Sequence, residues 1–319
     1  MHTVIKATLL VCGVICAVTL GLTRPARAQR PPVSKERNAA ALRDNNYLVI
    51  EQKLAPLGRN LHEPQPGEWL HEHQEPGQNF AEYLRARPMR RTSRLNHIYI
   101  CLLGDFSDEQ TKLLDRTRSY LEIFFATPVE IRNRVPLKEI PEGARRQHPT
   151  WGDSQVLSTW VLDELLKPNV PNDALAYLAF TSSDLWPGDG WNFVYGQANL
   201  RDRTGVWSVY RNGDPSKGKE ESDLCLRRTL RTASHETCHI LTMQHCIAFQ
   251  CNLNGVNHQA EGDSKPLHLC PVCLRKLCWN LQVDPNTYLA RLRRFCQDNG
   301  LDDEAKWYAE AIQVLKSGK

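Results

Sequence analysis

The sequence has no strong excess of charge of either sign, no basic run, no internal repeat and no ladder of aromatic residues. Its formal net charge of +4 over 319 residues is too small to indicate a protein that binds nucleic acid or an acidic membrane surface. Beyond residue 22 it also lacks any apolar run long enough to cross a bilayer. Hydrophobic residues make up 41% of the chain and charged residues 24%, so we expect a globular protein with a buried core.

The first 28 residues have the three parts of a secretory signal peptide. Lys6 gives a weakly basic start, residues 7–22 are almost entirely apolar, and residues 26–28 read Ala-Arg-Ala, the small-x-small pattern of a cleavage site. The alternative is an uncleaved membrane anchor, but the apolar run is short for a span. We therefore predict cleavage after Ala28 and export of a protein that no longer contacts a membrane. Residues 29–45 are polar and predict a linker.

Patterns typical of strands and helices alternate between residues 97 and 181. Runs of apolar, β-branched and aromatic residues predict strands at 97–103, 129–132 and 174–181. Helical periodicity predicts an amphipathic helix that begins at the capping box of Ser107 and Gln110, and a second one at 156–166. This alternation implies an α/β sheet covered by helices.

The segments on either side of this region predict further elements. Two β-rich pieces at 191–197 and 205–211, joined by a polar turn, predict a hairpin, so at least one edge of the sheet is antiparallel. The remaining predictions are a strand at 47–50, a loop at 67–78, a helix that begins near Asp223, and two amphipathic helices between 284 and 315 that are broken at Asn299-Gly300.

Residues 235–239 read HETCH and suggest a metal centre. His235 and His239 are four residues apart, so a helix places both imidazoles on one face, where they can bind one metal ion. Glu236 lies beside them and can act as a general base toward a water on that metal. Three protein ligands and a water are typical of a hydrolytic zinc site. His245 is the candidate third ligand, and a surface histidine is the alternative.

The spacing of His245 fits the longer pattern HExxHxxGxxH, except that Thr242 stands where that pattern has glycine. Glycine suits this position because the chain must turn sharply there, often with a positive φ. A β-branched threonine resists such a conformation. Either the turn is made differently in this chain, or His245 is displaced.

Eleven cysteines are present, and nine of them lie outside the signal segment. Cys246 and Cys251 enclose four residues, whereas Cys270 and Cys273 enclose two. Two close pairs separated by a loop are typical of a four-cysteine zinc site, which would stabilise the loop-rich residues 246–282. In an exported protein the alternative is two disulfides. The other five cysteines are expected to be buried small hydrophobic residues: Cys101, Cys225, Cys238, Cys278 and Cys296.

Taken together, these residues resemble the archaemetzincin family of zinc metallopeptidases. HETCH, His245 and the four cysteines occur in register, and residues 185–200, 252–258 and 266–278 are also similar. The resemblance covers about residues 46–315. It implies a compact, metzincin-like zincin fold of the mixed α/β class, with an antiparallel edge strand over the HExxH helix. It also implies two zinc ions, a catalytic one on His235, His239 and His245 with Glu236 as general base, and a structural one on Cys246, Cys251, Cys270 and Cys273.

The resemblance further implies a zinc-dependent hydrolase that cleaves a peptide or protein substrate in an aminopeptidase-like mode. We expect a monomer with a catalytic part at 46–245 and, packed on the same domain, a zinc segment with C-terminal helices at 246–319. Metzincins place a methionine in a turn beneath the catalytic zinc, and Leu253 matches that position here. The alternatives are a zinc protein of this fold that binds a peptide or partner with little activity, and a disulfide-rich hydrolase with one zinc.

Several polar groups are weaker candidates for a role at the site. Residues 191–200 are a candidate edge strand to which a substrate peptide adds, and an ordinary hairpin is the alternative. Tyr195 and Tyr210 are candidates for polarising a substrate carbonyl, although packed aromatic residues are the better interpretation. Asn257, His258 and Glu261 are candidates for supporting the metal ligands. The better interpretation of each one is a solvated loop residue.

Overall fold

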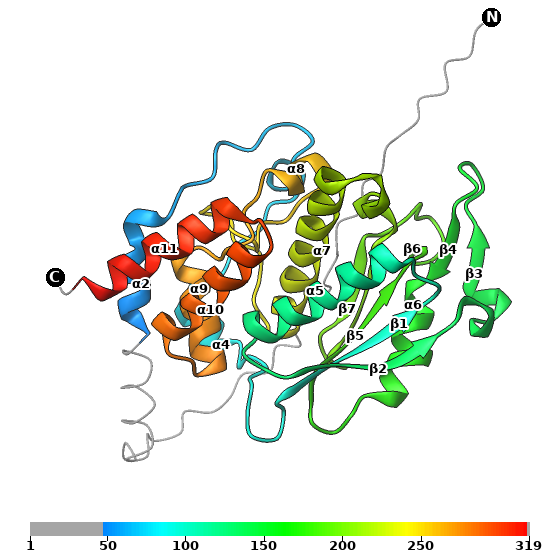
Figure 1. Ribbon diagram of the computed structural model, residues 1–319, viewed down its shortest axis with the longest axis horizontal. Helices are drawn as coiled ribbons and strands as arrows, with labels where there is room; N and C mark the ends of the chain where they lie inside the picture. The colour runs from blue at the N-terminus through cyan, green and yellow to red at the C-terminus, as the bar shows by residue number, and fades with distance from the viewer. Residues whose placement is uncertain (1–46, 318–319) are drawn as a thin grey trace, which may run out of the picture.

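The computed structural model describes residues 47–317 (Figure 1). The predicted signal segment, residues 1–28, and the predicted linker, residues 29–45, lie outside the described residues. Within residues 47–317 no helix is both long enough and apolar enough to span a membrane. The proposed division of the chain after residue 245 stays a prediction.

A five-stranded sheet forms the right half of the molecule in Figure 1, with strand order β2-β1-β5-β8-β7. Its strands are β1 (His97–Leu103), β2 (Val129–Val135), β5 (Ala174–Thr181), β7 (Gly196–Asn199) and β8 (Thr204–Ser208). The first four strands in that order run parallel, and β7 pairs antiparallel with β8 at the edge. The predicted strands at 97–103 and 174–181 and the predicted antiparallel edge are confirmed. Every residue of β5 is buried, as expected for a central strand covered on both faces.

Two long helices, α5 (Asp108–Phe124) and α7 (Lys219–Ile240), pack against each other and against the sheet. The predicted capping box of α5 is confirmed, because Ser107 and Gln110 exchange side-chain-to-backbone hydrogen bonds of 3.0 and 3.2 Å. Helix α7 begins four residues before the predicted start at Asp223. Glu220 and Glu221 explain the earlier start, since acidic side chains in the first turn are favoured by the helix dipole.

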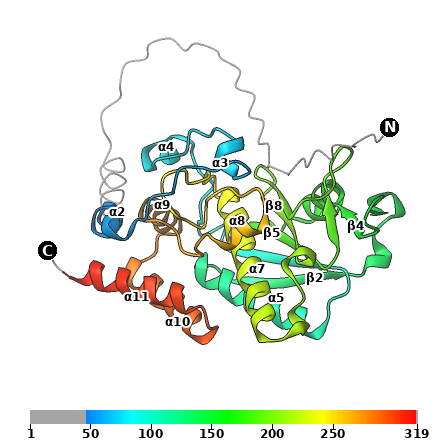
Figure 2. The same ribbon diagram turned by 90° about the horizontal axis from the view of Figure 1, so that it is seen from above.

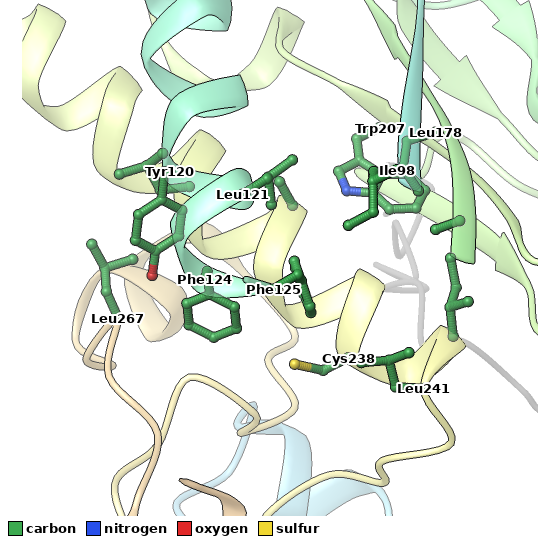
Figure 3. Close-up of a cluster of buried hydrophobic side chains, with 14 of the residues drawn as sticks. Ile98, Tyr120, Leu121, Phe124, Phe125, Leu178, Trp207, Cys238, Leu241 and Leu267 are labelled. Atoms are coloured by element: carbon green, nitrogen blue, oxygen red, sulfur yellow. The ribbon is translucent and has the colours of Figure 1, made fainter. Parts of the chain in front are cut away.

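The core lies where these two helices meet the sheet (Figure 3). Leu121, Phe124 and Phe125 at the end of α5 are at most 1% exposed. Figure 3 draws them between the sheet residues Ile98, Leu178 and Trp207 and the α7 end at Cys238 and Leu241. The mixed α/β class with an antiparallel edge beside the HETCH helix, predicted above, is therefore confirmed.

The predicted helix at 156–166 is only partly correct. Its first residues belong to β4 (Ser154–Leu157), and the helix that follows consists of α6 (Ser158–Trp160), a π-helix (Val161–Leu166) and a 3₁₀ turn (Lys167–Asn169). Strand β4 belongs to a second sheet, in which it pairs antiparallel with β3 (Arg145–Gln147) and parallel with β6 (Asp184–Trp186). Residues 154–157 form a strand because they pair with β6, 29 residues further along the chain. The periodicity of the local sequence carries no information about such a distant partner.

The predicted strand at 47–50 is wrong, because these residues begin the helix α2 (Leu48–Leu54). A short apolar run does not distinguish the two structures. Ile50 and Leu54, one helical turn apart, are completely buried where α2 packs on α9 (Pro271–Leu281) and α11 (Asp302–Lys316). The segment that follows contains α3 (Trp69–Glu72), inside the predicted loop at 67–78, and α4 (Phe80–Arg85), as Figure 2 shows.

The remaining elements are the short α8 (Gln259–Asp263) and, after α9, the hairpin of α10 (Pro285–Asp298) and α11. The predicted break of the last two helices at Asn299-Gly300 is confirmed. Short 3₁₀ turns complete the described chain at Ala55–Leu57, Leu137–Glu139, Glu142–Ala144, Tyr210–Asn212 and Pro215–Lys217.

Leu121→Ala tests the packing of α5 on the sheet. Leu121 is completely buried, so the substitution should lower the free energy of unfolding by about 2–5 kcal/mol, through lost burial and a residual cavity. Urea unfolding of the purified protein measures the change. Ile123→Ala, at a partly buried position of the same helix, is the matched control and should cost clearly less. Equal losses at both positions would contradict this description of the core.

Candidate active site

Three histidines converge at the end of α7. His235 and His239 project from its last two turns, and His245 returns from the loop that follows. One nitrogen of each ring lies within 4.8 Å of the corresponding nitrogens of the other two. The ring centroids are 4.6 Å apart for His235 and His239, 4.9 Å for His239 and His245, and 5.2 Å for His235 and His245. The structure thus brings the three predicted ligands together and does not displace His245.

Hydrogen bonds fix the orientation of all three rings. Nδ1 of His235 donates to the carbonyl of Asn252 at 2.7 Å, and Nδ1 of His239 donates to the carbonyl of Met243 at 2.6 Å. A carbonyl oxygen only accepts, so in both rings the proton sits on Nδ1 and the Nε2 lone pair is free. Nδ1 of His245 lies 2.9 and 3.0 Å from the two carboxylate oxygens of Glu75, which leaves its Nε2 free as well.

The donor set fits a metal cation. The Nε2 atoms of His235 and His239 lie 3.0 Å apart, so two lone pairs face each other with no proton between them. A tetrahedral zinc with Zn–N bonds of about 2.0–2.1 Å separates its nitrogen ligands by about 3.3 Å. Burial, followed by the neighbouring histidines, lowers the pKa of His239 to about 3 and that of His235 well below its usual value. Both rings are therefore neutral at physiological pH, as metal ligands must be.

Thr242 makes the turn that the glycine of the longer pattern would make. Its φ is +69°, in the left-handed region that a β-branched residue rarely adopts. Its backbone N–H donates to the carbonyl of His239 at 2.7 Å and ends the helix. The side chain gains a compensating contact, because the N–H of Met89 donates to Thr242 Oγ1 at 3.2 Å. The turn therefore has the same left-handed conformation that glycine would adopt, and Thr242 is strained in it.

Leu253 occupies the turn that is expected beneath the metal. The side chain is completely buried, and its carbonyl accepts a hydrogen bond from the N–H of Cys246 at 2.8 Å. The preceding residue is Asn252, whose carbonyl orients His235. The turn therefore supports the histidine centre through its backbone.

Residues 65–78 form a strap across the site, and the sequence reasoning missed its role. The strap supplies Glu75, the carboxylate that holds His245. Trp69 of the strap meets the His245 ring edge-on, with centroids 5.3 Å apart. Its indole also covers Gly255, where a Cβ atom would come within 2.4 Å of the ring, so only glycine fits there. The one available signal was the unusual density of Trp, His and Glu in WLHEHQE.

The weaker polar candidates anchor this strap. The carboxylate of Glu261 accepts hydrogen bonds from the backbone N–H groups of Trp69, at 3.2 Å, and of Asn257, at 2.7 Å. The Asn257 side chain donates to the carbonyl of Gly67 at 3.1 Å, and His258 caps α8 through the N–H of Glu261. Their contacts hold the strap and the turn after Leu253 in place.

A pocket opens beside the three histidines. Glu236 is partly buried and lines it together with His235, His245, and the edge residues Tyr195 and Gly196 next to and in β7. Burial raises the pKa of Glu236 to about 7, although the charges of His245 and Arg231 act in the opposite direction. The candidate substrate strand therefore does border the site.

The two tyrosines proposed as weaker candidates lie in different places. Tyr195 borders the pocket and packs edge-on against Phe193, with centroids 5.4 Å apart. Tyr210 is 42% exposed, and its hydroxyl donates to Asp153 at 2.7 Å. Only Tyr195 is among the residues that line the pocket.

The four predicted cysteine ligands form a second cluster. The sulfur atoms of Cys246, Cys251, Cys270 and Cys273 all lie within 4.8 Å of one another, and the residues are buried. Sγ of Cys246 is 3.7 Å from Sγ of Cys270, whereas a disulfide bond is about 2.05 Å long. Zn–S bonds of about 2.3 Å place tetrahedral sulfur ligands about 3.8 Å apart. All nine cysteines of the described chain are free and buried, and the cluster has the geometry of a metal site.

Known proteins are similar to the part of the chain that carries both clusters. The model of Peptidase family M54 matches residues 144–278. Human archaemetzincin-2 is 31% identical over 246 residues, which cover 66% of this chain and 67% of the human protein. Archaemetzincin-2 of Pongo abelii is 31% identical over 309 residues, covering 79% of this chain and 84% of that protein. The chain belongs to the archaemetzincin family.

Membership in the archaemetzincin family makes the chain a zinc metallopeptidase, a hydrolase that acts on a peptide or protein. The match to Peptidase family M54 contains all three histidines, Glu236 and all four clustered cysteines, while Glu75 lies outside it. The solved archaemetzincin of Methanopyrus kandleri is 25% identical and superimposes with a TM-score of 0.48, covering 60% of this chain and 99% of that one.

Two substitutions of Thr242 separate its strain from its hydrogen bond. Thr242→Val keeps the β-branch and removes the acceptor for Met89, so it should lower the free energy of unfolding by about 1–3 kcal/mol. Thr242→Gly loses the same bond but relieves left-handed strain worth about 1–2 kcal/mol, so its net effect should be close to zero. Urea unfolding measures both. If Thr242→Gly lowered the free energy of unfolding more than Thr242→Val, the backbone at Thr242 would not be strained.

Proposed function

We propose that His235, His239 and His245 hold a catalytic zinc ion and that Glu236 is the general base of peptide hydrolysis. One observation carries this proposal: three imidazoles with their Nδ1 protons engaged direct their Nε2 atoms to one point, beside a carboxylate that lines a pocket. Hydrolysis needs these groups together, since a metal site, a base and room for a substrate are all required.

Each group of the chain has a defined task in this mechanism. A zinc ion on three protein nitrogens, when bound, acidifies a water molecule and polarises a substrate carbonyl. Glu236 accepts a proton from the attacking water and delivers it to the amine nitrogen as the peptide C–N bond breaks. The free edge of β7 offers backbone groups with which an extended substrate can pair, and this pairing would hold the carbonyl beside Glu236.

We propose a second, structural zinc on Cys246, Cys251, Cys270 and Cys273. Support comes from the sulfur spacing and from two backbone N–H groups that point at Cys251 Sγ, those of Leu253 at 3.5 Å and Cys270 at 3.3 Å. Such donors stabilise a thiolate that would otherwise be costly to bury. This site would hold together the irregular chain between His245 and α9.

The mode of cleavage and the location of the protein are also proposals. The aminopeptidase-like mode implied by the family resemblance predicts that peptides with a free N-terminus are cleaved and that acetylated ones are not. The signal pattern of residues 1–28 predicts export of a protein that begins after Ala28, and we propose separately that this protein is a monomer. N-terminal sequencing and size-exclusion chromatography of the exported protein test these two expectations.

Glu236→Gln tests the general base without disturbing the metal site. The change removes the proton acceptor and keeps the shape of the side chain, so cleavage of a peptide library, followed by mass spectrometry, should slow by about 10²–10⁴-fold. Zinc measured by plasma mass spectrometry should remain at two ions per chain. Glu310→Gln, at an exposed position of α11, is the control and should keep full activity.

The same measurements decide between the proposed enzyme and its alternatives. Two zinc ions without turnover in the unaltered protein would favour a binding protein of this fold. A single zinc ion would overturn the four-cysteine site, and full activity in Glu236→Gln would overturn the base.

Glu75→Gln tests the support of His245. An amide holds the imidazole less strongly than a carboxylate, so zinc affinity at the histidine centre should fall by about 10–100-fold. Competition with a chromophoric chelator measures this, and only one of the two bound zinc ions should become easier to remove. The control is Glu72→Gln, an exposed carboxylate of the same strap that pairs with His71. An unchanged affinity in Glu75→Gln would contradict the role of Glu75.

A further inference from the structure

Three arginines of α7 line the pocket beside the histidines: Arg227, Arg228 and Arg231. Two of them have carboxylate partners. Arg227 lies 3.3 Å from Glu304, and Arg228 makes a two-pronged pair with Asp263 at 2.6 and 2.9 Å. Arg231 has no carboxylate within ion-pair distance among residues 47–317.

Arg231 is also the most deeply placed of the three. It is 8% exposed, its Nη2 donates to the carbonyl of Asn254 at 2.9 Å, and its buried Nε has no partner in the described chain. The carboxylates of Glu236 and Glu261 act on its charge but form no ion pair with it, whereas natural proteins normally pair a buried cation directly. Burial lowers the pKa of Arg231 to about 10, so the group still carries its charge at neutral pH. An unpaired charge in a pocket calls for a ligand of opposite sign.

The position of Arg231 relates this charge to the catalytic centre. Arg231 precedes His235 by four residues on α7, which places it about 6 Å along the helix axis. It lines the same pocket as Glu236. Successive residues of an extended peptide advance by about 3.3 Å, so a group bound by Arg231 belongs to a residue within about two positions of the scissile bond.

We propose that this pocket binds a carboxylate of the peptide substrate through Arg231, and that peptides with a carboxylate within two residues of the scissile bond are the preferred substrates. The inference rests on the proposed function, because it assumes that the histidine centre is where cleavage occurs. Arg231 is the specificity-determining residue, and a charge-assisted hydrogen bond from a guanidinium to a carboxylate supplies the preference.

The dimensions of the pocket agree with such a ligand. The cavity has a volume of about 90 Å³, which is room for several water molecules or for a carboxylate side chain. Gly262 forms part of the wall, and a Cβ atom added there would lie 3.7 Å from Nη1 of Arg231. The glycine therefore leaves the guanidinium accessible from that side. The carboxylate has two possible sources, the side chain of Asp or Glu and the free C-terminus of the residue after the cleaved bond.

Paired synthetic peptides test the inference and separate these sources. Each pair differs only by Glu or Gln at one position of a mixed library, and each peptide is made with a free and with an amidated C-terminus. Mass spectrometry gives relative kcat/KM values. The unaltered protein should prefer a carboxylate over its amide by about 10- to 100-fold, at one position within two residues of the cleaved bond. A preference for Glu identifies the side chain, and a preference for the free C-terminus identifies the α-carboxylate.

Arg231→Gln should bring this ratio close to one, and Arg231→Lys should retain part of it because the charge remains. The ratio is the readout, since a purely structural role would lower the cleavage of all peptides alike and leave the ratio unchanged. Arg293→Gln, at an exposed position of α10, is the matched control and should keep the full preference. An undiminished ratio in both Arg231 variants would overturn the inference.

A binding measurement distinguishes failure of this inference from failure of the proposed function. Fluorescence anisotropy of labelled Glu and Gln peptides on zinc-loaded Glu236→Gln protein reports the preference without cleavage. Tighter binding of the carboxylate peptide, lost in Glu236→Gln/Arg231→Gln, would support the inference even if the unaltered protein cleaved nothing. Cleavage without any preference for a carboxylate, in rate or in binding, would overturn the inference and leave the peptidase intact.

Discussion

The hydrogen bonds to the three Nδ1 atoms are the constraint on which the rest of the site depends. A histidine ring can turn about two bonds, so spacing along a helix does not by itself direct a lone pair to a metal. Here three separate segments provide the acceptors: the carbonyls of Asn252 and Met243 and the carboxylate of Glu75. Each acceptor fixes a tautomer as well as a direction. The loop after α7 and the strap at 65–78 are therefore parts of the proposed metal centre, although the loop contains one predicted ligand, His245, and the strap contains none.

The histidine centre and the cysteine cluster are connected in two ways. His245 and Cys246 are consecutive, so the histidine centre and the sulfur cluster meet within a single step of the chain. A second connection starts in α9, whose buried Lys276 donates to the carbonyl of Gln78. The Gln78 side chain in turn bonds the carbonyl of Thr242 at 3.1 Å and the N–H of Gln244 at 3.2 Å. Both routes end on the turn that delivers His245, so ordering the cysteine segment also orders the third histidine.

The sequence predicted those features whose determinants are local. Strands β1 and β5, the capping box of α5 and the spacing of HETCH can each be identified within a few residues. The features that the sequence did not predict depend on contacts between distant parts of the chain. Glu75 lies 170 positions before His245, and α2 is a helix because of contacts with α9 and α11. The lack of an ion pair at Arg231 is likewise not visible in the sequence, because it depends on which side chains the fold brings close.

The turn at Leu253 shows why a departure from the methionine pattern is tolerated. Its shape is fixed by polar contacts that do not involve the side chain of residue 253. The Asn254 side chain donates to the carbonyls of Cys246 at 2.6 Å and Phe249 at 2.9 Å, and accepts from the N–H of Cys251 at 2.8 Å. What remains for residue 253 is to fill an apolar space, and exchanges between leucine and methionine usually cost less than about 1.5 kcal/mol. Arg231 holds the carbonyl of Asn254 in the same turn, so the residue that would select the substrate also secures the backbone that orients His235.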